Sequence, residues 1–232
     1  MPSNMTHARM AGLLYLVVVL TGFFSLAYVP SQTLVPGDAA GTLNRIASSE
    51  SLFRLGIAAG FLCYLAFLLL PFPLYRLLSP VHNGAALLMV AFVLVSTPIS
   101  FLTLTHKLNI VSFLGEGGRL GTLRGEQLQT QVMLSLEAYR NGVLLAKIFW
   151  GLWLLPFGYL VYKSRLLPRV LGLLLMAGCF GYLIDVFARV LAHGYAGSRL
   201  AAFIPMPGSL GEISICLWLL IVGARESARA AG

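Results

Sequence analysis

Long runs of apolar residues, separated by polar or glycine-rich segments, dominate the chain from end to end. Six of these runs approach or exceed the roughly 20 residues that an α-helix needs to cross the hydrocarbon core of a bilayer. The pattern therefore predicts an all-α fold, a polytopic membrane helical bundle of about six transmembrane helices. The predicted spans are residues 10–29, 52–74, 84–104, 142–162, 170–191 and 208–223.

The segments between the spans are of two kinds, tight turns and longer loops. In the first long loop, Asp38 precedes a run that places Leu43 and Ile46 on one face, which predicts a short capped helix. The second long loop begins with glycine-rich polar sequence, but after Gly125 it favours a helical extension of the fourth span. These two loops together predict a cap on one side of the membrane.

The basic residues near the ends of the spans indicate which way the chain crosses the membrane. Arg76, Lys163 and Arg165 stand in the two tight turns, and Arg225 and Arg229 stand in the C-terminal tail. Cytoplasmic segments carry the excess of Lys and Arg. We therefore expect a multi-pass protein of the inner (plasma) membrane, with both termini cytoplasmic, the cap extracytoplasmic and the whole chain forming one domain.

The composition narrows the class of protein. Of the 232 residues 58% are hydrophobic and 10% are charged, against about 25% charged in an ordinary soluble domain. These values exclude a soluble enzyme, a disordered chain and a coiled coil. The net charge of +8 comes from basic residues at the ends of apolar runs, where they meet anionic head groups. We expect membrane lipids as partners, and no nucleic acid.

Charged residues inside predicted spans need a reason, because each costs about 2.5–3.5 kcal/mol at mid-membrane on insertion scales. All of those found here fall toward the predicted outer side, which indicates an outward-facing polar cavity roofed by the first two loops. The predicted ligand-binding residues are Arg54, Lys147, Asp185, Arg189 and Glu212 within the spans, with Asp38 and Arg140 from the loops. A small polar or lipid-like ligand fits such a set.

Three functions remain open on the residues alone. The first is binding or transport of that ligand, in a monomer or a homodimer. The second is an intramembrane hydrolase of lipid-linked substrates, with or without a metal, in which Asp185 or Glu212 would act as acid, base or ligand. The third is an accessory subunit, in which Asp185 pairs with Arg189, and Lys147 with Glu212, only to fix helix packing.

Metal ligation has thin support in the sequence. The outer side supplies carboxylates and two histidines, His106 and His193, but neither H-x-x-x-H nor H-E-x-x-H spacing occurs. We therefore predict no metal site, and the sequence identifies no cofactor. Cys63, Cys179 and Cys216 each lie inside an apolar run and are interpreted as packing residues.

Prolines and a weak internal repeat mark the second and fourth spans. Pro71 and Pro73 predict an unwound turn near the inner end of the second span.

The second and fourth spans share a weak internal repeat. Each runs from an aromatic residue and an arginine, Phe53-Arg54 or Tyr139-Arg140, to Leu-Leu-Pro-Phe. This is consistent with a parallel repeat, as in transporters, and also with coincidence in leucine-rich sequence.

Several segments carry a family resemblance. They include A-R-M-A-G-L-L-Y-L, V-P-G-D-A-A-G-T-L-N-R-I-A-S-S-E-S-L-F-R-L-G, F-G-Y-L-V-Y-K-S-R-L-L-P-R-V-L-G and G-S-L-G-E-I-S-I-C-L-W-L-L-I-V-G. The chain thus resembles an uncharacterised bacterial family of multi-pass membrane proteins, domain of unknown function 4386, except over residues 80–141. The resemblance implies a single membrane domain and no particular activity, and Asp38, Arg54, Asp185 and Glu212 lie in the resembling segments.

Overall fold

The computed structural model describes residues 4–114 and 125–224, and these residues form helices and no strand. Six helical segments are long and apolar enough to cross a membrane, which confirms the predicted all-α architecture with six spans. They are Asn4–Thr33, Glu50–Leu78, Asn83–Leu114, Glu126–Ser164, Arg169–Leu191 and Arg199–Ile221. The chain is a multi-pass membrane protein, and the side on which its termini lie stays a prediction.

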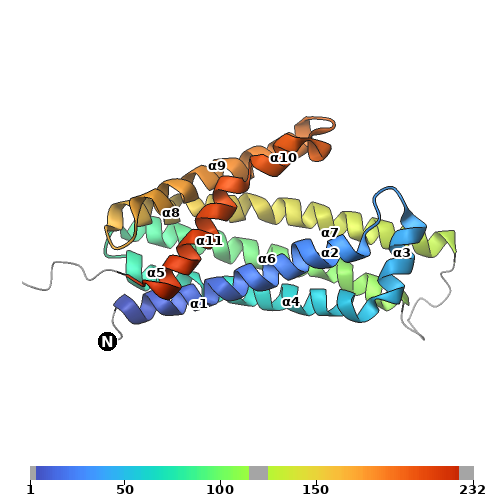
Figure 1. Ribbon diagram of the computed structural model, residues 1–232, viewed down its shortest axis with the longest axis horizontal. Helices are drawn as coiled ribbons and strands as arrows, with labels where there is room; N and C mark the ends of the chain where they lie inside the picture. The colour runs from blue at the N-terminus through green and yellow to red at the C-terminus, as the bar shows by residue number, and fades with distance from the viewer. Residues whose placement is uncertain (1–3, 115–124, 225–232) are drawn as a thin grey trace, which may run out of the picture. The chain divides into compact units, whose positions relative to one another are not determined.

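Most of these segments are built from more than one helix (Figure 1). The first begins with α1, continues through a π-helical stretch, η1, and ends with α2. In chain order the elements are α1 Asn4–Phe23, η1 Phe24–Tyr28, α2 Val29–Thr33, α3 Ala39–Ser48, α4 Glu50–Leu69, α5 Pro71–Leu78, α6 Asn83–Leu114, α7 Glu126–Leu152, α8 Leu154–Ser164, α9 Arg169–Leu191, η2 Tyr195–Gly197, α10 Arg199–Phe203 and α11 Met206–Ile221.

Two helices extend well beyond the predicted spans. α6 continues to Leu114 instead of ending near Leu104, and α7 begins at Glu126. The start of α7 confirms the predicted extension after Gly125. The glycine-rich start of the second loop lies mostly at 115–124, outside the described residues, as do Arg225 and Arg229 of the tail.

The predicted unwinding at the prolines of the second span is wrong. α4 and α5 are separated only by Leu70, whose backbone stays helical (φ −56°, ψ −42°) and whose N–H still bonds to the Ala66 carbonyl at 2.9 Å. Pro71 and Pro73 therefore interrupt the helical hydrogen bonds without opening a turn. The fourth segment has a similar break at Trp153, before the Pro156 that the repeat aligns with Pro71.

Contacts divide the chain into two compact units, each of which is described by itself. The first unit comprises Met1–Leu16, Ala66–Thr97 and Leu144–Gly232. The second unit comprises Val17–Leu65 and Pro98–Val143. That the chain forms one domain stays a prediction.

The second unit has a core of aliphatic and aromatic side chains. Its buried members are Val29, Ile46, Phe53, Ile57, Ile110, Val132 and Leu136. α3 contributes Ile46 and begins at the predicted cap, because the Asp38 side chain accepts a hydrogen bond from the Gly41 N–H at 2.8 Å. The short helix of the first loop is therefore confirmed.

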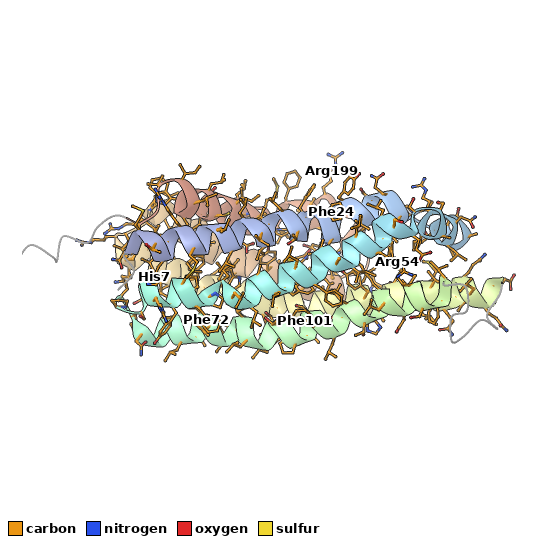
Figure 2. All side chains as sticks on the ribbon, turned by 90° about the horizontal axis from the view of Figure 1, so that it is seen from below. His7, Phe24, Arg54, Phe72, Phe101 and Arg199 are labelled. Atoms are coloured by element: carbon orange, nitrogen blue, oxygen red, sulfur yellow. The ribbon has the colours of Figure 1, made fainter. Side chains whose placement is uncertain are left out.

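The first unit packs α8 and α11 against α9. Its largest fully buried side chain is Trp153, whose ring contacts Tyr15, Phe67 and Phe157 at centroid separations of 5.9, 5.2 and 5.1 Å. In both units large apolar side chains also point outward. Phe72, labelled in Figure 2, is 49% exposed. Such outward apolar faces suit a protein whose surroundings are lipid.

Candidate functional site

A buried carboxylate with two cationic partners lies in the first unit. Asp185 on α9 has no exposed surface. The Lys147 ammonium, from α7, donates to its Oδ2 at 2.7 Å, and the Arg189 Nε donates to Oδ1 and Oδ2 at 3.1 and 3.0 Å. One negative charge is thus shared by two positive charges.

Helical periodicity explains part of this arrangement. Asp185 and Arg189 are four residues apart, so they lie on one face of α9. The predicted pairing of these two residues is confirmed. The two cationic side chains are 22% (Lys147) and 31% (Arg189) exposed, whereas that of Asp185 is fully covered. The uncompensated charge of this cluster therefore lies on its accessible side.

A second carboxylate, Glu212 on α11, has hydroxyl partners instead of cations. The Tyr15 hydroxyl of α1 donates to Oε1 at 2.9 Å, and the Tyr182 hydroxyl of α9 donates to Oε2 at 2.9 Å. Each carboxylate oxygen is therefore held by a tyrosine from a different helix. Glu212 is half-buried, and Tyr15 is fully buried.

Glycines bring these three helices close together. A Cβ placed on Gly12 of α1 would lie 2.6 Å from the Leu220 backbone nitrogen of α11. A Cβ on Gly178 of α9 would collide with the Gly208 Cα of α11. Small residues permit such backbone approach in membrane bundles. Larger side chains at these crossings would separate α11 from both of its neighbours.

The same glycines set the position of the polar side chains. Each is followed, three or four residues later and so on the same helix face, by one member of the Glu212 cluster. The pairs are Gly12 with Tyr15, Gly178 with Tyr182, and Gly208 with Glu212. The close crossings therefore lie one turn away from the point where the carboxylate and the two hydroxyls meet.

Tyr182 connects the two carboxylate clusters. Its hydroxyl binds Glu212, and its ring centroid lies 6.0 Å from the Lys147 ammonium, which is the outer limit of a cation–π contact. Tyr195, in the turn after α9, lies beside Arg189 with 5.9 Å between ring centroid and guanidinium carbon. Burial raises the pKa of the Tyr195 hydroxyl, and the charge of Asp185 raises it further.

The structure brings some of the predicted site residues together and leaves others in local contacts. Lys147 pairs with Asp185, so its predicted pairing with Glu212 is wrong. The remaining three predicted residues belong to the second unit. Arg54, labelled in Figure 2, pairs with Glu50, Arg140 pairs with Glu137, and Asp38 caps α3. Their role in ligand binding stays a prediction.

Sequence reasoning missed one buried charge, Lys107 of the second unit, because it placed this residue outside a span. The Lys107 side chain is 3% exposed, and its ammonium lies 4.1 Å from the Tyr139 ring centroid and 3.3 Å from the Ser25 carbonyl oxygen, to which it donates. The apolar residues that continue past Leu104 with helical spacing are the signal that could have found it.

The π-helical register of η1 explains why the Ser25 carbonyl needs this partner. Val29 donates its N–H to the Phe24 carbonyl, five residues back. The same register would give Ser25 the N–H of residue 30, which is a proline and has none. Lys107 supplies the missing donor. We therefore assign it a structural role.

Among the described residues, the side chains that could ligate a metal are dispersed. Within residues 4–114 and 125–224, no three His, Cys, Asp or Glu side chains lie close enough to hold a metal ion. Cys63, Cys179 and Cys216 are all buried, in keeping with their interpretation as packing residues.

Similarity to known proteins extends over most of the chain. A family model described as "Domain of unknown function (DUF4386)" matches residues 10–223, which include the stretch 80–141 that the sequence resemblance left out. An uncharacterized protein of Archaeoglobus fulgidus is 31% identical over 154 residues, which cover 66% of this chain and 75% of that protein. No solved structure matches the chain.

Proposed function

The chain belongs to the family described as domain of unknown function (DUF4386), and from that premise we propose that it binds or transports a ligand through an anionic group, a phosphate or a carboxylate. The group would be carried by a small polar or lipid-like molecule. The residues that we propose to hold it are Lys147 and Arg189, with Asp185 between them to set their positions.

One observation carries this proposal: two cations share one fully buried carboxylate inside membrane spans. Asp185 balances one positive charge, and the other remains. An uncompensated charge in a span is costly and typically marks a ligand or ion pathway. Arginine and lysine are also the side chains that bind phosphate and carboxylate groups, arginine through two parallel donors.

The geometry supports binding from the accessible side of the cluster. Arg189 uses only Nε toward Asp185, so its two terminal nitrogens are not engaged with that carboxylate. Lys147 uses one of three donors in the same way. Donors therefore remain for an anion that approaches opposite Asp185.

We would test this by thermal unfolding of the purified protein with three probes. These are inorganic phosphate, dihexanoyl phosphatidylglycerol, which is anionic, and dihexanoyl phosphatidylcholine, which has no net charge. A ligand at 100 times its Kd stabilises the folded state by about 2.7 kcal/mol. We expect an increase in Tm with phosphatidylglycerol or phosphate, and a smaller increase with phosphatidylcholine.

The matched variants are Lys147→Gln and Arg189→Gln, with Arg199→Gln as the control. Arg199 is exposed and makes no ion pair with a described residue. The first two variants should lose the anion-dependent increase in Tm, and the control should keep it. An equal increase in all three would contradict the proposal and favour a structural role for the ion pairs. A response to phosphate alone would indicate a small anion, and a response to phosphatidylglycerol alone a lipid.

A further inference from the structure

The two intramembrane carboxylates of the first unit, Asp185 and Glu212, have different kinds of partner. Asp185 has two cations within 3.1 Å. Glu212 has two tyrosine hydroxyls at 2.9 Å and, among the described residues, no ion pair. The charge of Asp185 is therefore balanced inside the protein, and that of Glu212 is not.

An acid in this setting can exist in either protonation state with its hydrogen bonds satisfied. When it is ionised, the carboxylate accepts from both Tyr15 and Tyr182, as observed. When it is protonated, its new O–H can donate to one of these hydroxyl oxygens, because a hydroxyl both donates and accepts. Partners that serve both states favour a site that gains and loses a proton.

From this geometry we infer that Glu212 is a proton-binding site of the membrane domain. The step is simple: the Glu212 carboxylate takes up one proton to become a neutral carboxylic acid, and releases it again. Uncharged acids in spans avoid the cost of a lone charge, and carboxylates that do this form proton relays in pumps and transporters.

The groups that face Glu212 come from three helices. α1 contributes Tyr15 and α9 contributes Tyr182, while the nearest titratable neighbour on α11 itself is the buried Cys216, one turn along. Lys147 reaches the cluster only through the Tyr182 ring.

Tyr182 gives the proton site a connection to the proposed anion site. It is three residues before Asp185 on α9, and its ring is also near Lys147. Binding of an anion adds negative charge beside Lys147, which favours protonation of Glu212. This second part of the inference rests on the proposed function: the ligand is taken up together with a proton, so that the pair carries no added charge.

Infrared spectroscopy of the protein in lipid nanodiscs, titrated with acid, tests the proton site without any ligand. We expect a protonated-carboxyl C=O band, shifted in deuterium oxide, that Glu212→Gln lacks. Glu126→Gln, which removes an exposed carboxylate at the start of α7, should keep it. Persistence of the same band in Glu212→Gln would overturn the inference.

Tyr182→Phe keeps the acid and removes one donor to its ionised form. The band should therefore appear at a higher pH than in the wild type, by about one pH unit, which is a tenfold change in proton affinity. No shift in this variant would contradict the role of the tyrosines, even where Glu212→Gln fails to fold.

Addition of inorganic phosphate separates the two parts of the inference. A shift of the band to higher pH with phosphate in the wild type, absent in Lys147→Gln, supports coupling. A normal band that phosphate leaves unchanged overturns the coupling while the proton site stands. A phosphate-dependent increase in Tm without any Glu212 band upholds the anion site and overturns the proton site.

Discussion

Asp185 is the shared partner of two cations in the membrane spans of the first unit, and it balances one of their two charges. We predict that Asp185→Asn lowers the free energy of unfolding. Removing one partner of a buried ion pair costs roughly 3–5 kcal/mol, and the lower end applies because Lys147 and Arg189 are 22% and 31% exposed. Reversible unfolding in mixed detergent would measure it.

The matched control for that prediction removes one negative and one positive charge together. The double variant Asp185→Asn with Lys147→Met leaves Arg189 as the only charged residue of the cluster. The net charge of the cluster is then +1, the same as in the wild type. It should recover part of the lost stability. A double variant that is less stable than Asp185→Asn alone would contradict the view that unbalanced charge is the cause.

Lys107 offers a second residue-scale prediction, because Pro30 leaves the Ser25 carbonyl without its helical donor. Lys107→Met should destabilise the wild type more than it destabilises a Pro30→Ala protein, in which residue 30 regains an N–H. A hydrogen bond to a charged group contributes about 1.5–3 kcal/mol, so the two costs should differ by about 1 kcal/mol or more. Equal costs in a double-mutant cycle would contradict this.

How far single residues could be predicted depended on the distance along the chain between the partners. Asp185 and Arg189 are four residues apart, so local helical geometry was sufficient. The partner of Lys147 depends on which face of α7 meets α9, and short-range sequence does not contain this. The tyrosines that hold Glu212 are 197 and 30 residues away from it. No local pattern links them.

At the scale of the elements, the close crossing of α1 and α11 should tolerate no added atom. We predict that Gly12→Ala destabilises the protein by about 1–3 kcal/mol, the usual cost of overpacking. Its Cβ would meet three backbone atoms of α11 between 2.6 and 2.9 Å. The same variant should disturb the Tyr15–Glu212 hydrogen bond one turn away, which the infrared band of Glu212 would report.

Gly22 provides the control on the same helix. A Cβ there would meet only the Cys63 Sγ, at 3.3 Å. Replacing a helical glycine with alanine otherwise stabilises the folded state by about 0.5–1 kcal/mol, which offsets this tight contact. Gly22→Ala should therefore change stability little. Equal destabilisation by Gly12→Ala and Gly22→Ala would show that the crossing is not the cause.

Hydropathy located the helices but not all of their ends. The predicted spans lie almost entirely within the observed helices because apolar length is what a bilayer requires. α6 and α7 extend beyond the predicted ends of their spans. The hydropathy falls where a helix leaves the predicted membrane region, but the helical hydrogen bonds of the backbone do not depend on hydropathy and continue. Pro71 and Pro73 predicted an unwound turn, but Leu70, which separates α4 from α5, keeps helical backbone angles.

At the scale of the whole molecule, the orientation in the membrane is the prediction to test. The protein's own thiols are buried, so single cysteines introduced at exposed positions should react selectively. Ala40→Cys and Ala196→Cys, in predicted outer loops, should react with a membrane-impermeant maleimide in intact cells. Pro80→Cys should react only after permeabilisation, and the reverse pattern would invert the predicted topology.

The central claim is that Lys147 and Arg189 hold an anionic group in the membrane. Native mass spectrometry of the protein with dihexanoyl phosphatidylglycerol or phosphatidylcholine counts bound molecules directly. We predict one tightly held phosphatidylglycerol on the wild type and on Arg199→Gln, and none on the Lys147→Gln, Arg189→Gln double variant. Equal occupancy on all three proteins, or no preference for the anionic lipid together with no response of Tm to phosphate, would contradict the account.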